Sequence, residues 1–353
     1  MEAKAYLKDY IKKTEKILDS FFKEKKKEAA KISPITAAIM KRYPQFMGGK
    51  SIRGSLTKLG YECYGGKDQK AILKASIMAE IVHTALLVHD DIMDKDVLRR
   101  GMPTMHVQYS SLHRAKRYQG EADHYGLSMA VDMGDIGLVL PQLILADADF
   151  SDEIKTRVLR CFNRQLLATA LGQALDVNLE LVTKLAEEDI LKIHHYKTAN
   201  YTITGPLQYG ALFVGADEKE VEKIEQYGLP VGIAFQLRDD ELGLFADEKT
   251  LGKPIGSDVK ENKNTILHLK ALELAKGKER AFIKKTYGKK NLTQNELKRV
   301  RQITEKTGAL AYSQKMAREL VKKGKKFVPQ LTTKPALQDT LYKMADFMIE
   351  RES

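Results

Sequence analysis

A dense cluster of carboxylates lies in the segment DDIMD, which contains Asp90, Asp91 and Asp94. Residues four positions apart share one face of a helix, so Asp90 and Asp94 are expected to lie one turn apart with Asp91 beside them. Like charges at this spacing repel each other, and residues 86–88 just before the cluster are apolar. A bound cation would relieve the repulsion, and a site made only of oxygen ligands suits Mg²⁺. Taken alone, the pattern is equally compatible with an acidic surface patch.

A second cluster lies in the segment FQLRDDELG, which contains Asp239 and Asp240. Asp239, Gly243 and Asp247 recur at intervals of four and therefore share a helical face. Two acidic faces on two apolar helices favour a shared site. Because Mg²⁺ binds through a few carboxylates together with substrate phosphates, such a site would hold a diphosphate through several metal ions.

Basic residues occur where a bound anion would need them. The turn Gly48-Gly49 allows the backbone to approach a ligand, and cationic side chains follow it. His83 lies two helical turns before Asp90 on the same face; it is either a ligand contact or a structural histidine. The candidate cations are Lys50, Arg53, Arg99, Arg100, Lys197 and Lys253.

Composition narrows the class of protein. The chain has 353 residues with 43% hydrophobic and 30% charged residues, which excludes a disordered or fibrous protein. Its net charge of +12 favours acidic partners such as phosphorylated substrates, although a lysine-rich solvated surface explains most of the excess. The absence of Trp and of a recognition motif argues against nucleic-acid binding.

The termini and the cysteines indicate a soluble cytoplasmic protein. The chain begins MEAKAYLKDYIKK, which has no apolar core of a secretory signal. The most apolar run, residues 136–146, is too short to span a bilayer and contains Pro141. Two cysteines, Cys63 and Cys161, cannot form a disulfide framework and fit a reducing compartment.

Helical periodicity recurs along the whole chain, and no long stretch alternates with period two. We therefore expect an all-α protein with one domain over residues 1–353. The expected helices cover about residues 3–31, 69–96, 125–147, 151–182, 187–213, 217–246, 261–276, 293–323 and 335–351.

The ordered set of motifs resembles the trans-polyprenyl (isoprenyl) diphosphate synthase family over roughly residues 40–270. The motifs are GGKSIR, EIVHTALLVHDDIMD, RRGMPT, GDIGL, GQALD, YKT, FQLRDDELG and GKPIGSD. Within the family, the segment FQLRDDELGLFADEKTLGKPIGSD is most similar to geranylgeranyl diphosphate synthases. The resemblance implies an isoprenoid synthase-type helical bundle around a central substrate cavity, a homodimer, about three Mg²⁺ ions per active site and at most peripheral membrane contact.

The resemblance also implies roles for individual residues. Asp90, Asp91 and Asp94 form the first aspartate-rich motif, and Asp239 and Asp240 the second; Asp90, Asp91, Asp94 and Asp239 would be the Mg²⁺ ligands. The remaining assignments are Lys50, Arg53, His83 and Arg100 to isopentenyl diphosphate, Arg99, Lys197 and Lys253 to the allylic diphosphate, and Thr198 and Gln236 to the developing carbocation.

Two positions depart from the family pattern, and one near the C-terminus is open. Gly54 stands where the family often has proline. Gly243 stands where the second motif often has its last aspartate, and either a water or Asp247 would replace that ligand. Arg351 would close over isopentenyl diphosphate, or it would belong to a frayed surface tail, which its terminal position favours.

The implied reaction is Mg²⁺-dependent head-to-tail condensation of isopentenyl diphosphate with dimethylallyl, geranyl or farnesyl diphosphate. The growing tail is expected to run back along the DDIMD helix, where an aromatic residue four or five positions before the motif stops growth early in the family. Here these positions are Leu86 and Ala85, with Val82, Ile81 and Met78 as a lower floor. We therefore expect a C20 product, with C25 or longer as the next alternative and C15 as a further one.

Other functional classes fit the sequence less well. A terpene cyclase is also all-α and Mg²⁺-dependent, but positions 239, 243 and 247 lack the middle hydroxyl of its second motif, and it has no use for GGKSIR. A catalytically silent subunit typically loses aspartates, whereas both aspartate pairs are present here. Elongation of an allylic diphosphate by isopentenyl diphosphate would separate these classes.

Overall fold

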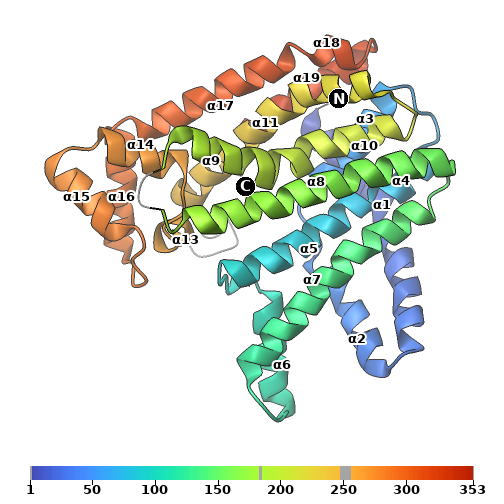
Figure 1. Ribbon diagram of the computed structural model, residues 1–353, viewed down its shortest axis with the longest axis horizontal. Coiled ribbons are helices and arrows are strands. Elements are labelled where there is room, and N and C mark those ends of the chain that lie inside the picture. Colours follow the sequence, from blue (N-terminus) through green and yellow to red (C-terminus); the bar gives the residue numbers. More distant parts are fainter. Residues whose placement is uncertain (1, 183–184, 247–255, 353) are drawn as a thin grey trace. The chain divides into compact units, whose positions relative to one another are not determined.

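The computed structural model describes residues 2–182, 185–246 and 256–352, and these residues are mostly helical (Figure 1). The strands found among them are two residues long, Leu98–Arg99 (β1) and Met102–Pro103 (β2), and they form an antiparallel hairpin. The all-α fold class is thereby confirmed. The chain divides into two compact units, which are described separately: unit 1 comprises Met1–Arg160 and Pro206–Ala216, and unit 2 comprises Cys161–Gly205 and Asp217–Ser353.

Unit 1 contains the N-terminal helices. They are α1 (Ala3–Ala30), α2 (Pro34–Arg42), η1 (Tyr43–Phe46), α3 (Ile52–Cys63), α4 (Gln69–Ser76), α5 (Met78–Met93), α6 (Met105–Lys116), α7 (Ala122–Ala146), most of α10 (Gly205–Leu212) and the start of α8 (Asp152–Leu179).

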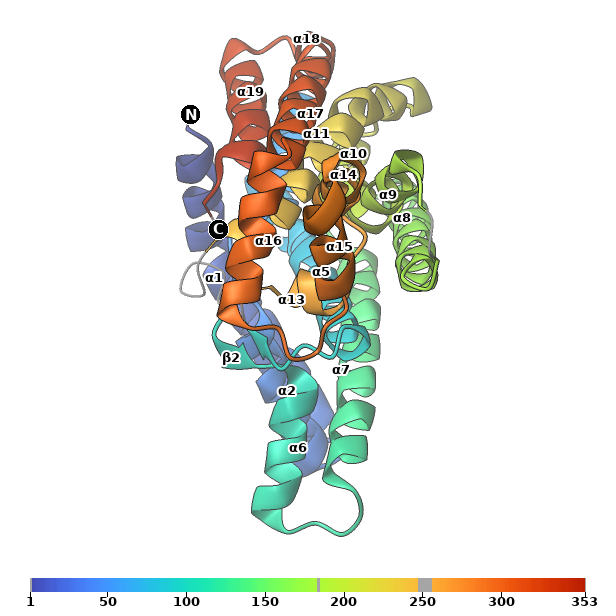
Figure 2. The ribbon, with the colours of Figure 1, turned by 90° about the vertical axis from the view of Figure 1, so that its left-hand side faces the viewer.

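Helix α5, which carries the first aspartate motif, packs along α7 in unit 1. The contact is close because α7 has glycines where α5 and η1 approach it: a Cβ added at Gly137 would lie 2.7 Å from the Cβ of Ala85 and 2.0 Å from the hydroxyl of Tyr43. That hydroxyl donates to the carbonyl of Ile81 at 2.9 Å. Helix α6 lies beside α7 (Figure 2). These contacts hold α5 rigidly in the core of unit 1.

Unit 2 contains the second aspartate motif. Its elements are the remainder of α8, α9 (Glu187–Ile193), the π-helix η2 (His194–Thr204), α11 (Glu218–Phe245), α13 (Ser257–Lys260), α14 (Ile266–Leu274), α15 (Gly277–Thr286), α16 (Gln294–Lys306), α17 (Ala309–Lys325), α18 (Val328–Leu331) and α19 (Pro335–Glu350).

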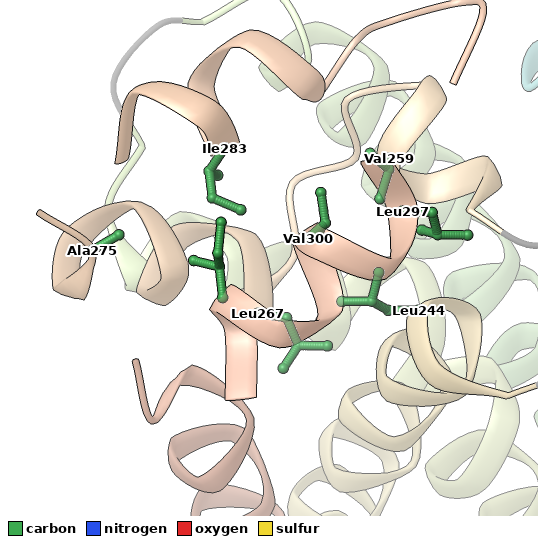
Figure 3. Close-up of a cluster of buried hydrophobic side chains, with 8 residues drawn as sticks. Leu244, Val259, Leu267, Ala275, Ile283, Leu297 and Val300 are labelled. Carbon is green, nitrogen blue, oxygen red and sulfur yellow. The ribbon is translucent and has the colours of Figure 1, made fainter. Parts of the chain in front are cut away.

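Helix α11 is the centre of unit 2 and packs against η2, α17 and α19. Its crossing with η2 is close because a Cβ at Gly232 would lie 2.6 Å from the Cβ of Ala199. The C-terminal end of α11 enters a separate apolar cluster with α13–α16, drawn in Figure 3. The buried members of this cluster are Leu244, Val259, Leu267, Ala275, Ile283, Leu297, Val300 and Ile303.

The helix bounds differ from the expected ones at several places. The expected helix over 69–96 is two helices, with Ile77 in a turn between them. The expected helix over 293–323 breaks at Gly308, whose φ of +84° is the left-handed conformation that ends helices. Helix α3 was not expected from the sequence, and the structure buries it on nearly all sides, its polar residues Arg53, Ser55, Thr57 and Lys58 included.

Two helical stretches are long and apolar enough to cross a membrane by length and composition alone. They are residues 69–93 and 122–146, with mean hydropathies of 1.7 and 1.5. In the first stretch 72% of the apolar window is buried within the protein, as in the core helix of a soluble protein, and in the second 44% is buried. The second stretch contains the run 136–146 that the sequence singled out as apolar.

Candidate active site

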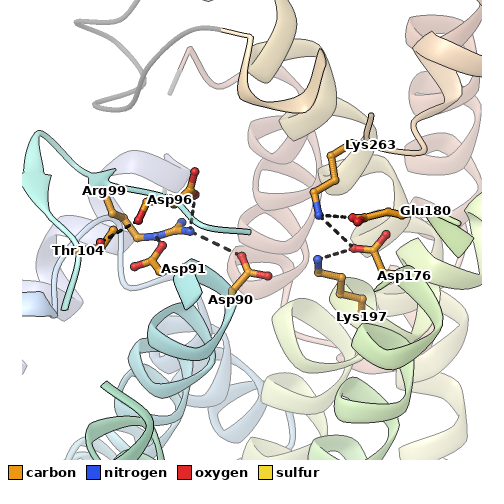
Figure 4. Close-up of polar contacts among 9 residues, drawn as sticks. All are labelled: Asp90, Asp91, Asp96, Arg99, Thr104, Asp176, Glu180, Lys197 and Lys263. Carbon is orange, nitrogen blue, oxygen red and sulfur yellow. Dashed lines mark hydrogen bonds and ion pairs between the residues drawn. The ribbon is translucent and has the colours of Figure 1, made fainter. Parts of the chain in front are cut away.

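In unit 1 the first aspartate motif is organised around the guanidinium group of Arg99 (Figure 4). Arg99 Nε donates to Asp91 Oδ1, while Arg99 Nη2 lies 3.3 Å from Asp96 Oδ2 and 3.6 Å from Asp90 Oδ2. The β1–β2 hairpin directly after α5 brings Arg99 back over the end of that helix. The motif is therefore not a solvated acidic patch but a compact group of carboxylates around one cation.

Burial affects the acidity of this group. Withdrawal from water raises the pKa of Asp91 to about 7, although the charge of Arg99 and its hydrogen bond act in the opposite direction. Asp90 is half-buried, as is Asp94, whose backbone N–H bonds to the carbonyl of Asp90 at 2.8 Å. Asp90 and Asp94 thus lie one helical turn apart, as the spacing predicted.

Asp96 belongs to this group although we did not assign it to the site from the sequence. Its side chain is 8% exposed, and its carbonyl accepts a 2.8 Å hydrogen bond from the hydroxyl of Thr104. Asp96 lies beyond the end of α5, so helical spacing did not place it with Asp90. Its position three residues before Arg99 was the available signal.

A second group in unit 1 forms around the turn Gly48-Gly49. These glycines have φ values of +140° and +93°, and a Cβ at Gly49 would lie 3.0 Å from Nη2 of Arg100. Arg100 Nη1 also donates to the carbonyl of Phe46 at 3.3 Å. The guanidinium of Arg100 therefore lies against the glycine turn, which is possible only because the turn has no side chains.

Lys50 and Arg53 follow this turn, and Arg53 is buried within α3. His83 is half-buried and lies near the same arginines. Its pKa is lowered well below the usual value, first by burial and then by the positive charges of Arg53, Arg100 and Arg99. His83 is therefore neutral near pH 7 and is able to donate or accept a hydrogen bond. The residues assigned to isopentenyl diphosphate from the motifs are thus grouped in unit 1.

The residues expected to set product length all lie on α5. Met78, Ile81, Val82 and Ala85 are buried, and Leu86 is half-buried. Ala85 packs against α7 at Gly137, so a larger side chain there would have to displace that helix. Of the two positions nearest the aspartate motif, Leu86 therefore has more room for change.

In unit 2 the π-helix η2 positions Lys197. A Cβ at Gly172 of α8 would lie 2.4 Å from the backbone nitrogen of Lys197, so this glycine permits a close approach. One turn further along α8, Asp176 Oδ2 forms an ion pair with Lys197 Nζ at 2.6 Å. The GQALD and YKT motifs are thereby joined. π-Helices frequently occur at functional sites.

Lys263 is a second cation beside Asp176, and the sequence did not indicate it. Its Nζ lies 2.7 Å from Glu180 Oε1 and 3.9 Å from Asp176 Oδ2, and its side chain is 13% exposed (Figure 4). Lys263 lies in a polar run, VKENKN, that resembles an ordinary loop. Only the fold of unit 2 reveals that it lies next to the partner of Lys197.

Thr198 and Gln236, both assigned to the carbocation, contact each other in unit 2. The Thr198 hydroxyl donates to Gln236 Oε1 at 2.8 Å, and Gln236 Nε2 donates to Asp240 Oδ1 at 2.8 Å. His194 Nε2 lies 3.2 Å from the other oxygen of Asp240. Asp240 is therefore part of a buried hydrogen-bonded group that fixes the orientation of Gln236.

Asp239 has a partner from the C-terminus. Arg351 Nη2 lies 2.5 Å from Asp239 Oδ1, and the guanidinium stacks on the ring of Phe235 with its carbon 4.0 Å from the centroid. Arg238 holds the backbone of Arg351 by two hydrogen bonds to its carbonyl, at 3.0 and 2.9 Å. With 7% of its surface exposed, Arg351 is not part of a frayed tail, and that expectation is wrong.

Comparison with known proteins identifies the family. A family model described as polyprenyl synthetase matches residues 34–304. The geranylgeranyl diphosphate synthase of Sulfolobus acidocaldarius is 34% identical over 86% of this chain and 87% of its own. The geranylfarnesyl diphosphate synthase of Aeropyrum pernix is 31% identical over 86% of this chain and 91% of its own.

A crystal structure of the geranylgeranyl pyrophosphate synthase of Corynebacterium glutamicum, complexed with isoprenyl diphosphate and magnesium, is also similar. It aligns with a TM-score of 0.92 and 28% identity over 99% of this chain and all of that chain. This chain belongs to the polyprenyl synthetase family. The family resemblance and the isoprenoid synthase fold expected from the motifs are confirmed.

This polyprenyl synthetase family member departs from the second aspartate motif at Gly243, and the structure shows what lies there. A Cβ at Gly243 would lie 2.4 Å from Oδ2 of Asp258, so the carboxylate of Asp258 is beside the position of the missing side chain. A side chain at this position would require the Asp258 carboxylate to move aside. Asp247, the alternative considered from the sequence, and Lys253 lie outside the described residues.

The carboxylates of this family member suit Mg²⁺ by the chemistry of their donors. Asp90, Asp91 and Asp239 offer oxygen ligands, which this hard cation prefers. In the part of the chain that the structure describes, no three His, Cys, Asp or Glu side chains converge as a ready-made metal cage.

Proposed function

We propose that this protein condenses isopentenyl diphosphate with an allylic diphosphate to give a longer trans-prenyl diphosphate, and that the product is C20. One observation carries the proposal: Arg100 lies against the Gly48-Gly49 turn that precedes Lys50 and Arg53, whereas its neighbour Arg99 is bound by the carboxylates of the first aspartate motif. A prenyl chain-elongating enzyme needs a binding site for each of two diphosphates. A terpene cyclase needs only one.

The proposed binding sites divide the cations between the two substrates. Lys50, Arg53, Arg100 and neutral His83 bind isopentenyl diphosphate, His83 as a hydrogen-bonding partner that adds no charge. Arg99, Lys197 and Lys253 bind the allylic diphosphate. Lys263 joins Lys197 because both lie beside Asp176. Arginine and lysine suit this task because several N–H donors meet phosphate oxygens directly.

The proposed reaction begins when the allylic carbon–oxygen bond breaks. Asp90, Asp91, Asp94 and Asp239 would hold about three Mg²⁺ ions, which supply electrostatic stabilisation of the departing diphosphate. Arg99 and Lys197 donate hydrogen bonds to the same group as its charge grows. The hydroxyl of Thr198 and the amide of Gln236 direct their oxygen dipoles at the allylic cation; the Gln236–Asp240 hydrogen bond keeps that amide in one orientation.

Carbon–carbon bond formation follows while both substrates are held by their diphosphates. The double bond of isopentenyl diphosphate attacks the allylic cation, and holding the partners together removes most of the entropic cost of this encounter. Loss of a proton from the new cation restores a double bond and gives the elongated allylic diphosphate. The released diphosphate accepts this proton, because none of the residues assigned to the site has the role of a base.

Product length follows from α5. The positions preceding Asp90 carry no aromatic residue, and Leu86 and Ala85 leave room for a tail longer than C15. Deeper along the helix, Val82, Ile81 and Met78 provide mid-sized side chains that stop growth at C20. A geranylfarnesyl product is the next candidate, because Ala85 is small and the Aeropyrum pernix relative carries that name.

Incubation of the protein with isopentenyl diphosphate, Mg²⁺ and each of the dimethylallyl, geranyl and farnesyl diphosphates tests the proposal. We expect elongation to C20, read as the chain length of the dephosphorylated product. Cyclic hydrocarbon from an allylic diphosphate alone would indicate a terpene cyclase. If the protein by itself gave no product with any primer, it would be a silent partner subunit, and the proposal would be contradicted.

Leu86→Phe tests the proposed floor. The ring should fill the space beside the tail and shift the main product from C20 to C15, with little change in thermal stability because Leu86 is half-buried. Ala85→Phe is the matched comparison: it should also shorten the product but lower Tm markedly, since Ala85 contacts α7 at Gly137. An unchanged product length in Leu86→Phe would contradict the assignment of α5 as the wall of the tunnel.

The whole chain is proposed to act as one synthase domain in a cytoplasmic homodimer, with no nucleic-acid partner and at most peripheral membrane contact. Helix α7 supports the dimer, because four of its apolar side chains are 40–54% exposed and a second copy would cover them. They are Leu127, Val131, Val139 and Leu143. Molar mass by light scattering checks this: Val139→Asp should yield monomer, and an unchanged mass would locate the contact elsewhere.

A further inference from the structure

A buried carboxylate lies beneath the N-terminal end of α3 in unit 1 and has no role in the mechanism above. It belongs to Glu80 in the first turn of α5, and the residue is 7% exposed. Oε1 of Glu80 accepts a 2.7 Å hydrogen bond from the backbone N–H of Gly54. The backbone N–H of Arg53 also donates to this carboxylate. A buried carboxylate is costly to retain, so these bonds and nearby charges must offset the loss of hydration.

Glu80 caps α3 because α3 has no cap of its own. Ser51, which precedes the helix, has a φ of +47° and makes no side-chain hydrogen bond to the first turn. The first N–H groups of a helix need acceptors when they are buried. Glu80 supplies one from another helix, and its negative charge complements the positive end of the α3 dipole.

Glycine at position 54 makes this arrangement possible. A Cβ there would lie 2.1 Å from the hydroxyl of Tyr10, which is buried and bonded to Ser76 at 2.9 Å. The family often has proline at this position. Proline has no backbone N–H, so it would also remove the hydrogen bond that Gly54 donates to Glu80. The departure at Gly54 is therefore coupled to Glu80 and Tyr10 in this chain.

Glu80 also faces the cations assigned to isopentenyl diphosphate. The charges of Arg53 and Arg100 attract its carboxylate, although burial is the larger effect and raises its pKa. Arg53 is 6% exposed, so its guanidinium has little water around it and depends on protein groups for compensation. Without this carboxylate, the buried Arg53 would lose the negative charge that Glu80 places near the first turn of α3, and Arg100 would lose one of its two nearby carboxylates, the other being Asp91.

We propose that Glu80 is a positioning residue for the isopentenyl diphosphate site: its carboxylate fixes the first turn of α3 and holds Arg53 and Arg100 in the arrangement that receives the diphosphate. This inference rests on the proposed function of the Gly48–Arg53 segment. Glu80 does not contact the substrate. It acts through the backbone of α3 and through the two arginines.

Two substitutions separate its charge from its hydrogen bond. Glu80→Gln keeps an acceptor for the Gly54 N–H but removes the charge, whereas Glu80→Ala removes both. We expect Glu80→Gln to raise KM for isopentenyl diphosphate about tenfold, with KM for the allylic primer within about twofold of wild type and Tm nearly unchanged. Glu80→Ala should raise the same KM and also lower Tm, because α3 loses its cap.

Thr84→Val is the matched control on the same helix. It removes a buried side-chain hydrogen bond, from the Thr84 hydroxyl to the Glu80 carbonyl at 3.0 Å, without changing charge. Both KM values should stay near wild type in this variant. If Thr84→Val raised KM for isopentenyl diphosphate as much as Glu80→Gln, general loosening of α5 would explain the effect and the positioning role would be overturned.

The remaining outcomes discriminate further. A wild-type KM for isopentenyl diphosphate in Glu80→Gln would overturn the role of the charge, and equal increases in both KM values would show a structural role only. The proposed function fails separately: wild-type protein would then make no elongated product with any allylic primer. Elongation by wild type with no effect of Glu80→Gln would leave the function intact and refute this inference alone.

Discussion

The two units neutralise their aspartate motifs with cations from very different places in the chain. In unit 1, Arg99 lies eight residues after Asp91 and returns to it through a two-residue hairpin. In unit 2, Asp239 pairs with Arg351, which is 112 residues away at the end of α19. The first motif therefore pairs with an arginine that is close to it in the sequence, whereas the second pairs with one that only folding of the C-terminal residues brings near.

The difference has a consequence for the free protein. A carboxylate that must release an arginine before it binds a metal loses part of its affinity for that metal. Arg99 lies among three carboxylates and is also proposed to bind the allylic diphosphate. Arg351 lies beyond residues 34–304, which the family model matches, and its guanidinium pairs with Asp239.

The largest expected effect is loss of a metal ligand from either unit. Asp90→Ala and Asp239→Ala should each lower kcat about a hundredfold or more, because each removes charge compensation for the leaving diphosphate. Circular dichroism should remain that of wild type, since neither residue packs in an apolar core. Asp152→Ala, which changes a carboxylate that is 97% exposed, should retain full activity. Near-wild-type turnover in either motif variant would exclude that unit from metal binding.

A smaller effect distinguishes the two substrate sites. Arg53→Ala in unit 1 should raise KM for isopentenyl diphosphate about tenfold or more, and Lys197→Ala in unit 2 should do the same for the allylic primer, because each lost charged contact removes about 1.5–3 kcal/mol of binding. Steady-state kinetics with each substrate varied in turn measures both. Lys192→Ala, a half-exposed lysine near Lys197, is the control. Equal effects on both KM values would show that the assignment of cations to substrates is wrong.

The smallest effect concerns Arg351. Arg351→Gln should lower the Mg²⁺ concentration for half-maximal activity about two- to fivefold, as expected when an ion pair worth up to about 1 kcal/mol no longer competes. In EDTA the variant should also unfold at a lower temperature than wild type, and added Mg²⁺ with substrate should narrow that gap. Thermal unfolding with and without metal gives a readout independent of turnover. An unchanged Mg²⁺ midpoint would mean that Arg351 does not compete for Asp239.

Sequence patterns located much of the site because the relevant residues lie close together in the chain. Asp90, Asp91 and Asp94 lie within about one turn at the C-terminal end of α5, and Gly48-Gly49 comes just before Lys50 and Arg53. Helical periodicity also gave the all-α class and most long helices. Periodicity did not predict α3, which is buried on nearly all sides. It also did not predict that the helix expected over residues 293–323 would be interrupted at Gly308, between α16 and α17.

What the sequence determined by itself was the type and local spacing of the residues in each motif: carboxylates, which suit metal ions, and cations, which suit phosphates. Only the tertiary structure decided which distant groups meet these motifs. Asp239 with Arg351, Lys263 with Asp176 and Gly54 with Glu80 are separated by 112, 87 and 26 residues. The physical reason is that periodicity identifies neighbours along one helix. These partners are instead brought together by packing between distant segments, which the spacing of residues within one segment does not indicate.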